Sequence, residues 1–512
     1  MKTIRLASWA AVLSLVAVGC HKTTIVDRGW VGEQVLPTKP AAEIKFWDRA
    51  GGKEVTFSIS EPTSFRVRED RDGKLLVHDD NREGWVDKAQ FVRTADAVAY
   101  FTPLVEANPK DAFALTMRGL SLLFNKEPDK AIKDFDECLL LAPTDTDALK
   151  CRGAAWLDKK DYDKAIKDFD EAIRLSGKDE RAFYGRAVAW QSQKDYDKAI
   201  KDYDEAVRLS PEFAQGFVGR GTAWRGKNEF DNAMKDFDEA IRLDSGYADA
   251  FDRRANAWLA KREYDKAITD FDEAIRLDPK YSSAYLGRGL AWREKNELDK
   301  TVADLSEALR LDPELALAFE ARGMTWLTKD KLDNAIRDFD EAIRLEPERV
   351  SSFVGRGSAW SRKKEHDRAI RDFNEALRLK PRSASAHYHR GMARKRVKDY
   401  DGAIDDFDEA ISIDPGYEAA FVARGWSRRM KYELKPAIED FDAAIRLDPT
   451  DKYAFYDKAC CLAVLGRRDQ AIENLLHAVE LGYDVGSIRY EDDFDMIRSD
   501  PRVKKLLKRN DD

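Results

Sequence analysis

The segment AIKDFDEAIRL, residues 165–175, occurs again with small changes along most of the chain, and this repetition determines the fold class. It returns as AITDFDEAIRL at residues 267–277 and as AIRDFDEAIRL at residues 335–345. A fixed interval of twenty to fifty residues is the mark of an array of stacked structural units. The residues aligned with its first alanine follow at intervals of 34 and predict eleven units: Ala131, Ala165, Ala199, Ala233, Ala267, Thr301, Ala335, Ala369, Ala403, Ala437 and Ala471.

Each unit contains two helical patterns separated by a short turn. The polar segment KKDYD, residues 159–163, separates the two patterns in one unit, and Asp163 is predicted to cap the start of the second helix. Small and apolar residues recur at i, i+4 and i+7 in both halves of that unit: Leu149, Gly153 and Trp156, then Ala165, Phe169 and Ala172. Prolines end most second helices, because proline lacks the N–H that a helix interior needs: Pro211, Pro279, Pro313, Pro347, Pro381, Pro415 and Pro449.

The order of residue types within a unit resembles the tetratricopeptide repeat, a helix-turn-helix of 34 residues with a small residue, an aromatic residue, Ala, Phe, Ala and Pro. The resemblance covers residues 111–484 and implies a mainly α fold, a right-handed α-solenoid of eleven repeats. Residues 94–110 resemble an unpaired second helix that caps the array. Residues 485–512 are expected to form a C-terminal capping helix and tail, in which three apolar residues cover the last helix pair: Ile488, Phe494 and Ile497.

Three recurrent features are interpreted as structural. The acidic DFDE segments are expected to form surface ion pairs, as between Lys167 and Glu171 or between Asp170 and Arg174. A tryptophan recurs on the stripe that should face the core: Trp156, Trp190, Trp224, Trp258, Trp292, Trp326 and Trp360. An arginine of the first helix and an aspartate of the second, such as Asp168, are predicted to pair as a ladder that fixes helix packing. The ladder arginines are Arg118, Arg152, Arg186, Arg220, Arg254, Arg288, Arg322, Arg356, Arg390 and Arg424.

Composition and motifs give little support to catalysis or to nucleic-acid binding. A net charge of −8 lacks the basic footprint that binding to nucleic acid usually requires. His387 and His389 are two residues apart, which on a helix points them to different faces and argues against a shared metal ion. The glycines of GFVGRG, residues 216–221, lie within a helical pattern and not after a strand, so they are packing residues. We therefore expect no enzymatic activity, no metal and no cofactor.

The first residues resemble a targeting segment. Lys2 and Arg5 precede an apolar run, residues 6–18, of the length of a signal-peptide core. The sequence Ala-Val-Gly-Cys that ends at Cys20 resembles the lipobox of bacterial lipoproteins. This resemblance implies that residues 1–20 are a signal segment and that Cys20 is acylated, so the protein is expected to be exported and anchored to a membrane, facing the periplasm or the cell exterior. The other cysteines are interpreted as packing residues: Cys138, Cys151, Cys460 and Cys461.

Residues 24–93 have the character of a small β domain. The runs TFSI, FRVRE and KLLVH are short β-type segments separated by Asp, Asn and Gly. The closing segment REGWVDKAQFV, with Gly84, Trp85 and Val86, resembles the final strands of bacterial SH3-like barrels. Such barrels often bind cell-wall peptides or protein tails, but the fold alone does not fix a ligand. Trp30 and Trp85 either line a groove of this domain or belong to its core.

In the tetratricopeptide repeat family, partners lie in the concave groove lined by the first helices. Mapping that groove onto this chain gives residues that differ from unit to unit. The last repeats contribute a basic stretch beside two aromatic residues, where an acidic or carboxylate-bearing peptide could dock; an ordinary solvated face is the alternative. The mapped positions are Tyr184, Thr222, Arg225, Asn256, Arg293, Met324, Arg362, Tyr388, Met392, Lys395, Arg396, Trp426 and Arg429.

These observations favour a non-enzymatic scaffold of the bacterial cell envelope that binds a protein or peptide in the groove of its repeat array. The alternative is a protein that binds peptidoglycan through its SH3-like domain and uses the array as a spacer. A hydrolase with an unrecognised site is a third hypothesis, without a motif to support it.

Overall fold

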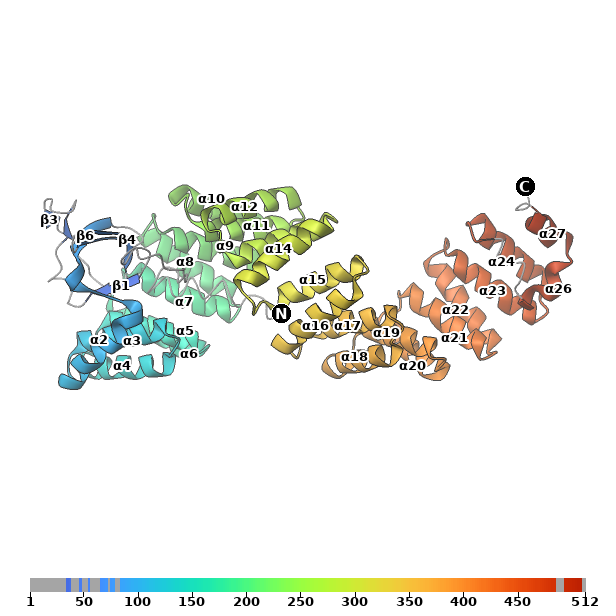
Figure 1. The fold of residues 1–512 in the computed structure, drawn as a ribbon, viewed down its shortest axis with the longest axis horizontal. Coiled ribbons are helices and arrows are strands. Elements are labelled where there is room, and N and C mark those ends of the chain that lie inside the picture. Colours follow the sequence, from blue (N-terminus) through green and yellow to red (C-terminus); the bar gives the residue numbers. More distant parts are fainter. Residues whose placement is uncertain are drawn as a thin grey trace. The chain divides into compact units, whose positions relative to one another are not determined.

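The computed structural model describes residues 34–37, 46–47, 54–55, 65–71, 74–78, 83–484 and 492–508. These residues belong to two compact units, residues 1–291 and 292–512, each of which is described by itself (Figure 1). The signal segment, Cys20, Trp30, the TFSI run and Ile488 lie outside the described residues, as does the side chain of Trp85.

The described strands of the first unit form one antiparallel sheet. They are β1 (Gln34–Pro37), β2 (Phe46–Trp47), β3 (Glu54–Val55), β4 (Phe65–Arg71), β5 (Lys74–His78), β6 (Glu83–Asp87) and β7 (Phe91–Arg93), in the order β3-β2-β6-β5-β4-β1-β7. The runs FRVRE and KLLVH and the Gly-Trp-Val segment fall on β4, β5 and β6, as predicted. An SH3-like barrel stays a prediction.

The rest of the first unit consists of helices. The helix α2 (Thr94–Ala107) follows the sheet, and the Thr94 hydroxyl donates to the Gln34 carbonyl at 3.4 Å. Helix pairs follow: α3 (Ala112–Phe124) with α4 (Pro128–Leu141), α5 (Thr146–Asp158) with α6 (Tyr162–Leu175), α7 (Glu180–Ser192) with α8 (Tyr196–Leu209), α9 (Ala214–Gly226) with α10 (Phe230–Leu243), and α11 (Ala248–Ala260) with α12 (Tyr264–Leu277). The helix α13 (Ser282–Glu294) spans the boundary between the units.

The second unit continues the same pattern. It contains α14 (Leu298–Leu311) and then the pairs α15 (Ala316–Thr328) with α16 (Leu332–Leu345), α17 (Val350–Arg362) with α18 (His366–Leu379), α19 (Ala384–Arg396) with α20 (Tyr400–Ile413), α21 (Glu418–Met430) with α22 (Leu434–Leu447), and α23 (Lys452–Val464) with α24 (Arg468–Glu480). The short helices α26 (Asp495–Arg498) and α27 (Pro501–Lys508) follow. The expected mainly helical, solenoid-like stack of helix pairs is confirmed.

The turn inside each pair is set by a residue with positive φ. In the pair α5/α6 this residue is Lys160, at φ 63°, and the backbone N–H of Asp161 donates to the Trp156 carbonyl at 2.9 Å. Such a left-handed residue closes the first helix and reverses the chain. The Asp161 side chain then accepts from the Lys164 N–H, so Asp161 caps α6. The prediction that Asp163 is this cap was wrong, because Asp163 already lies in the first helical turn.

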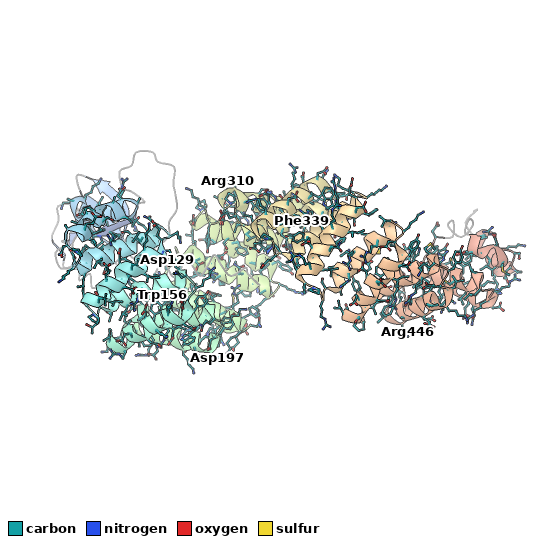
Figure 2. All side chains as sticks on the ribbon, turned by 90° about the horizontal axis from the view of Figure 1, so that it is seen from below. Asp129, Trp156, Asp197, Arg310, Phe339 and Arg446 are labelled. Carbon is teal, nitrogen blue, oxygen red and sulfur yellow. The ribbon has the colours of Figure 1, made fainter. Side chains whose placement is uncertain are left out.

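A buried aromatic residue on most second helices packs against a glycine of a neighbouring first helix, and Phe169 and Phe339 pack against two. Phe339, labelled in Figure 2, is fully buried on α16. A Cβ placed on Gly323 of α15 would lie 3.0 Å from its ring, and one placed on Gly355 of α17 would be closer still. The repeat therefore needs a small residue at this position of the first helix, because the helix backbone lies so close to the phenylalanine ring.

The predicted arginine–aspartate ladder is confirmed, and it joins successive pairs as well as the helices within one. The Arg356 guanidinium donates through Nε and Nη2 to Asp372 at 2.9 and 2.6 Å, and through Nη1 to Asp340 of the preceding pair at 2.6 Å. The surface pair expected between Asp170 and Arg174 is wrong. Asp170 instead accepts from Arg186 of the next first helix at 2.6 Å, and Arg174 donates to Glu171 at 2.8 Å.

Candidate functional site: the inner face of the first helices

Within each unit, successive first helices touch one another directly. The helices α5, α7, α9 and α11 form one such series, and α15, α17, α19, α21 and α23 form another, whereas successive second helices make at most sparse contacts. In a curved stack, neighbouring elements lie closer together on the concave side than on the convex side. We therefore call the surface shared by consecutive first helices the inner face.

The inner face changes chemically from pair to pair. Hydrogen bonds between consecutive first helices identify residues on it, such as Tyr281 to Asp249 at 2.6 Å, Ser351 to Glu320 at 2.7 Å, and Arg429 to Asp457 at 2.8 Å. One position of the first helices, taken at intervals of 34, differs from pair to pair: Lys150, Tyr184, Val218, Asp252, Leu286, Glu320, Val354, Tyr388, Val422 and Tyr456. Tyr184, Val218, Asp252 and Tyr456 are buried, so only the partly exposed members of this set can contact an extended partner.

The site residues predicted in the first unit have different environments. The Tyr184 side chain is 1% exposed and packs edge-on against Tyr203 and Phe213, with ring centroids 5.5 and 5.2 Å away, so it belongs to the core. The Thr222 hydroxyl donates to the Val218 carbonyl of its own helix at 2.8 Å. The Asn256 amide donates to the Asp252 carboxylate at 3.1 Å.

Arg225 lies beside a cluster of charges on α11. In that cluster Arg253 Nε donates to Asp249 at 3.0 Å, and Asp252 is 1% exposed. Burial raises the pKa of Asp252 to about 6, since Arg253 offsets the loss of water only in part. Burial, and then the like charge of Arg253, lowers the pKa of Arg225. No described residue forms a hydrogen bond or ion pair with the Arg225 guanidinium.

In the second unit, several predicted residues are already bound within the chain. Arg293 pairs with its neighbour Glu294 at 3.1 Å, and Arg362 Nη1 donates to the Leu327 carbonyl at 2.8 Å. Arg429 pairs with Asp457 and with Asp493, the latter from the segment that follows α24. Phe494 and Ile497 are buried against this end of the stack, as predicted. Arg429 is therefore not free to bind a partner.

The remaining predicted residues of the second unit lie on α15, α19 and α21. Met324 is 42% exposed, and Arg396 is exposed. The Tyr388 ring is half-buried, 4.9 Å from the Tyr417 ring, and the half-buried Met392 packs beside Phe407 and Ala423. These side chains give the inner face an apolar and aromatic surface at α19.

Lys395, like Arg225, has no acidic partner among the described residues. Its Nζ lies 4.3 Å from the centroid of the Trp426 ring, and no carboxylate of the described residues lies within ion-pair distance. Burial lowers the pKa of Lys395 to about 8, with a further contribution from Arg396 and an opposing one from Asp457. An ammonium group partly withdrawn from water without a counter-ion is unfavourable in the free protein, so an incoming carboxylate would gain more here than at an exposed lysine.

Other kinds of site find little support in the described part of the chain. No group of three or more His, Cys, Asp or Glu residues there could hold a metal ion. His389 stacks on Phe373 with a centroid distance of 5.9 Å, whereas His387 faces the Pro381 carbonyl at 3.1 Å, so the two histidines do not converge. No described helix is both long enough and apolar enough to cross a bilayer.

Sequence models of known families match much of the chain. Models described as tetratricopeptide repeat match residues 114–145, 146–179, 180–213, 253–316, 321–383 and 384–417, which together make up just over half of its length. A search of curated proteins found no match.

Several solved structures are similar to this chain. The crystal structure of YrrB, described as a TPR protein with an unusual peptide-binding site, has 21% identity and a TM-score of 0.31 and covers 36% of this chain and 95% of that chain. The crystal structure of yeast Tom70 has 18% identity and a TM-score of 0.35, and the match covers 78% of this chain and 99% of the Tom70 chain. The APC/C hetero-tetramer Cut9-Hcn1 has 15% identity and a TM-score of 0.38, with coverages of 80% and 98%.

Proposed function

Because the chain belongs to the tetratricopeptide repeat family, whose members generally mediate protein–protein interactions, we propose that it is a non-enzymatic scaffold that binds a protein or peptide on its inner face. The partner presents a carboxylate to Lys395 and apolar groups to the neighbouring aromatic side chains. Binding of this kind needs no reacting group. It needs a preformed surface whose polar groups gain a partner on association.

The observation that carries this proposal is the unpaired Lys395. Many cations of the array have acids beside them, as in the ladder and in the pair of Lys227 with Asp197 at 2.9 Å; Asp197 is labelled in Figure 2. Lys395 forms no ion pair with a described residue, since the nearby Asp457 pairs with Arg429, whereas Trp426 and Tyr388 provide the kind of half-buried aromatic surface that is enriched where partners bind. An acidic side chain that reached Lys395 would bring its neighbouring residues onto these rings.

A pair of matched peptides tests the proposal. One fluorescent peptide carries Asp and Glu beside aromatic residues, and its counterpart has every acid replaced by Asn or Gln. The acidic peptide should bind the full chain, and Lys395→Gln should weaken that binding. The same substitution at Lys435, an exposed lysine of the second helix α22, is the control and should have no effect. Equal binding of both peptides, or equal losses in both variants, would refute the proposal.

We also propose, from the sequence, that the protein is exported and held to a membrane through an acylated Cys20. Incorporation of an alkyne-bearing fatty acid, lost in Cys20→Ala, is the expected result, and labelling that persists in this variant would contradict it.

The alternative function, binding of peptidoglycan by residues 24–93, is supported by one observation. The pairing of β2 with β6 makes Trp47 and Trp85 partners in the backbone register of the sheet. If wall binding is the main function, purified wall material should sediment the full chain, and Trp47→Ala should abolish this while Lys395→Gln does not.

A further inference from the structure

The last helix pair, α23/α24, lacks a tryptophan–cation contact that is present in five earlier pairs. The pairs α19/α20 and α21/α22 lack it as well, but they have Arg394 and Arg428 at the tryptophan position. Leu462 stands where seven earlier pairs have tryptophan, as at Trp156 and Trp360. Gln470 stands where five of those pairs have a cation, as at Lys164 and Arg368, and two have an asparagine, Asn232 and Asn334. Both members of the tryptophan–cation contact are therefore missing together.

The arginine–aspartate ladder is also altered in this pair. Lys458 replaces the ladder arginine, and its Nζ pairs with Asp442 of α22 at 2.6 Å. Asn474 replaces the ladder aspartate, and its amide donates to the Gln470 carbonyl of its own helix at 2.8 Å. The charges of this pair remain balanced, since Lys458 keeps one acidic partner, Asp442, and the neutral Asn474 replaces the second acid. Side-chain volume, by contrast, has been lost.

A cavity of about 770 Å³ lies where these substitutions occur. Its lining comes from α22, α23 and α24 and includes Phe455, Lys458, Leu462, Gln470, Asn474 and His477. We call it the terminal cavity. Its size lies within the range of about 300–1,000 Å³ typical of ligand sites.

The earlier pairs show what fills the corresponding place. Trp156 is half-buried, and Lys164 Nζ lies 4.1 Å from its ring centroid. The same arrangement recurs in Trp190 with Lys198, also at 4.1 Å. Leu462 and Gln470, the residues at the indole and cation positions, both line the terminal cavity. The cavity thus borders the position where an indole lies in most other pairs, which is occupied here by the buried Leu462.

We propose that the terminal cavity receives an aromatic side chain, preferably an indole, from a partner protein. Phe455 and Leu462 provide apolar contact, and Phe455 is held edge-on to His477 with centroids 4.4 Å apart, an arrangement that a further ring can extend. The side-chain amides of Gln470 and Asn474 offer oxygen acceptors for the indole N–H. Lys458 and Asp442, which also line the cavity, pair with each other at 2.6 Å, and the exposed Arg467, Glu473 and Glu480 complete the charged part of its lining.

This site does not depend on the proposed inner-face function. Two of its three helices are second helices, and Lys395 is not among its residues. Loss of one binding event would therefore leave the other measurable.

Fluorine NMR of fluorinated N-acetyltryptophanamide, added to the full chain, tests the proposal. The probe signal should broaden in the presence of the wild-type protein, and Leu462→Trp should abolish this broadening by filling the cavity from within. Leu465→Trp is the matched control, because it adds an indole at a 37% exposed position of the following turn and should leave the broadening intact. No broadening with the wild type, or full broadening with a folded Leu462→Trp protein, overturns the proposal.

A second measurement removes the dependence on the folding of that variant. An indole that carries a photoreactive diazirine, irradiated with the wild-type protein, should form adducts on residues 455–477, and adducts spread over the other tryptophan-bearing pairs would refute the site. Sedimentation of the wild-type protein tests whether a second copy of this chain occupies the terminal cavity. A monomer is expected, and a dimer that Leu462→Trp dissociates would overturn the assignment to a different protein.

Discussion

Gly355→Ala should destabilise the second unit, and the reason lies in the packing of a single ring. The added methyl carbon would lie at 3.0 Å or less from three atoms of the Phe339 ring, which is fully buried. The ring has little room to move, because Gly323 of the preceding first helix also approaches its Cε1 and Cζ atoms. Overpacking of this kind lowers the free energy of unfolding by about 1–3 kcal/mol. The higher helix propensity of Ala than Gly offsets about 1 kcal/mol of this loss.

The chain offers its own means of relieving this clash. Leu305 occupies the position of Phe339 in the preceding repeat and is fully buried there. In a Phe339→Leu background, Gly355→Ala should therefore lose most of its cost, so the two substitutions should couple by about 1–3 kcal/mol. Native-state hydrogen exchange of the α16 and α17 amides measures this local free energy in a repeat protein that need not unfold in one step.

Gly177→Ala is the matched control, since only a backbone oxygen 3.9 Å away approaches a Cβ there. It should change exchange by less than about 1 kcal/mol. If Gly355→Ala leaves α16 and α17 as stable as before, or costs the same in both backgrounds, the packing argument is wrong.

Three further predictions concern charges. Asp372→Ala should remove both acceptors of Arg356 within its helix pair. The local free energy of unfolding should fall by about 3 kcal/mol, a value reached when one member of a largely buried ion pair is deleted. Faster amide hydrogen exchange confined to α17 and α18 would support this, and unchanged exchange there would contradict it. Binding of the acidic peptide should weaken as the pH rises from 7 to 9, because the Lys395 pKa of about 8 makes its ammonium lose charge in this range, whereas Lys395→Arg should hold its affinity in the same titration. Asp252 has a folded pKa of about 6, above its ordinary value of 3.8, so the folded state binds the proton more tightly and stability should rise as the pH falls from about 7 to 4. Thermal melts of Asp252→Asn should lack this part of the pH dependence, and equal slopes in both proteins would refute the assignment.

The sequence predicted the helix pairs and the ladder because both depend on spacing within a unit. Arg152 and Asp168 recur at fixed positions, so one pair of residues predicts all the others, and the hydrogen bonds at 2.9 and 2.7 Å agree. Asp161 was missed as the helix cap because two aspartates stand in the same short turn, and only the backbone angles distinguish them.

The candidate binding residues were less predictable, because their exposure depends on neighbours from other pairs. Tyr184 was assigned to the groove by its position, but Tyr203 and Phe213 enclose its ring. Arg429 belongs to the basic stretch in the sequence, yet Asp493, far along the chain, neutralises it. Lys395 shares that stretch and has no such acid within ion-pair distance among the described residues.

By itself, the sequence determined that the chain folds as a stack of helix pairs, since a unit that cannot bury its apolar stripe alone must bury it against the next copy. The tertiary structure decided which of the variable side chains remain available to bind a partner. It withdrew Arg429 into an internal ion pair, left Lys395 against an indole, and opened a cavity beside Leu462. These outcomes depend on distances between residues of different pairs, and the repeat interval alone does not specify them.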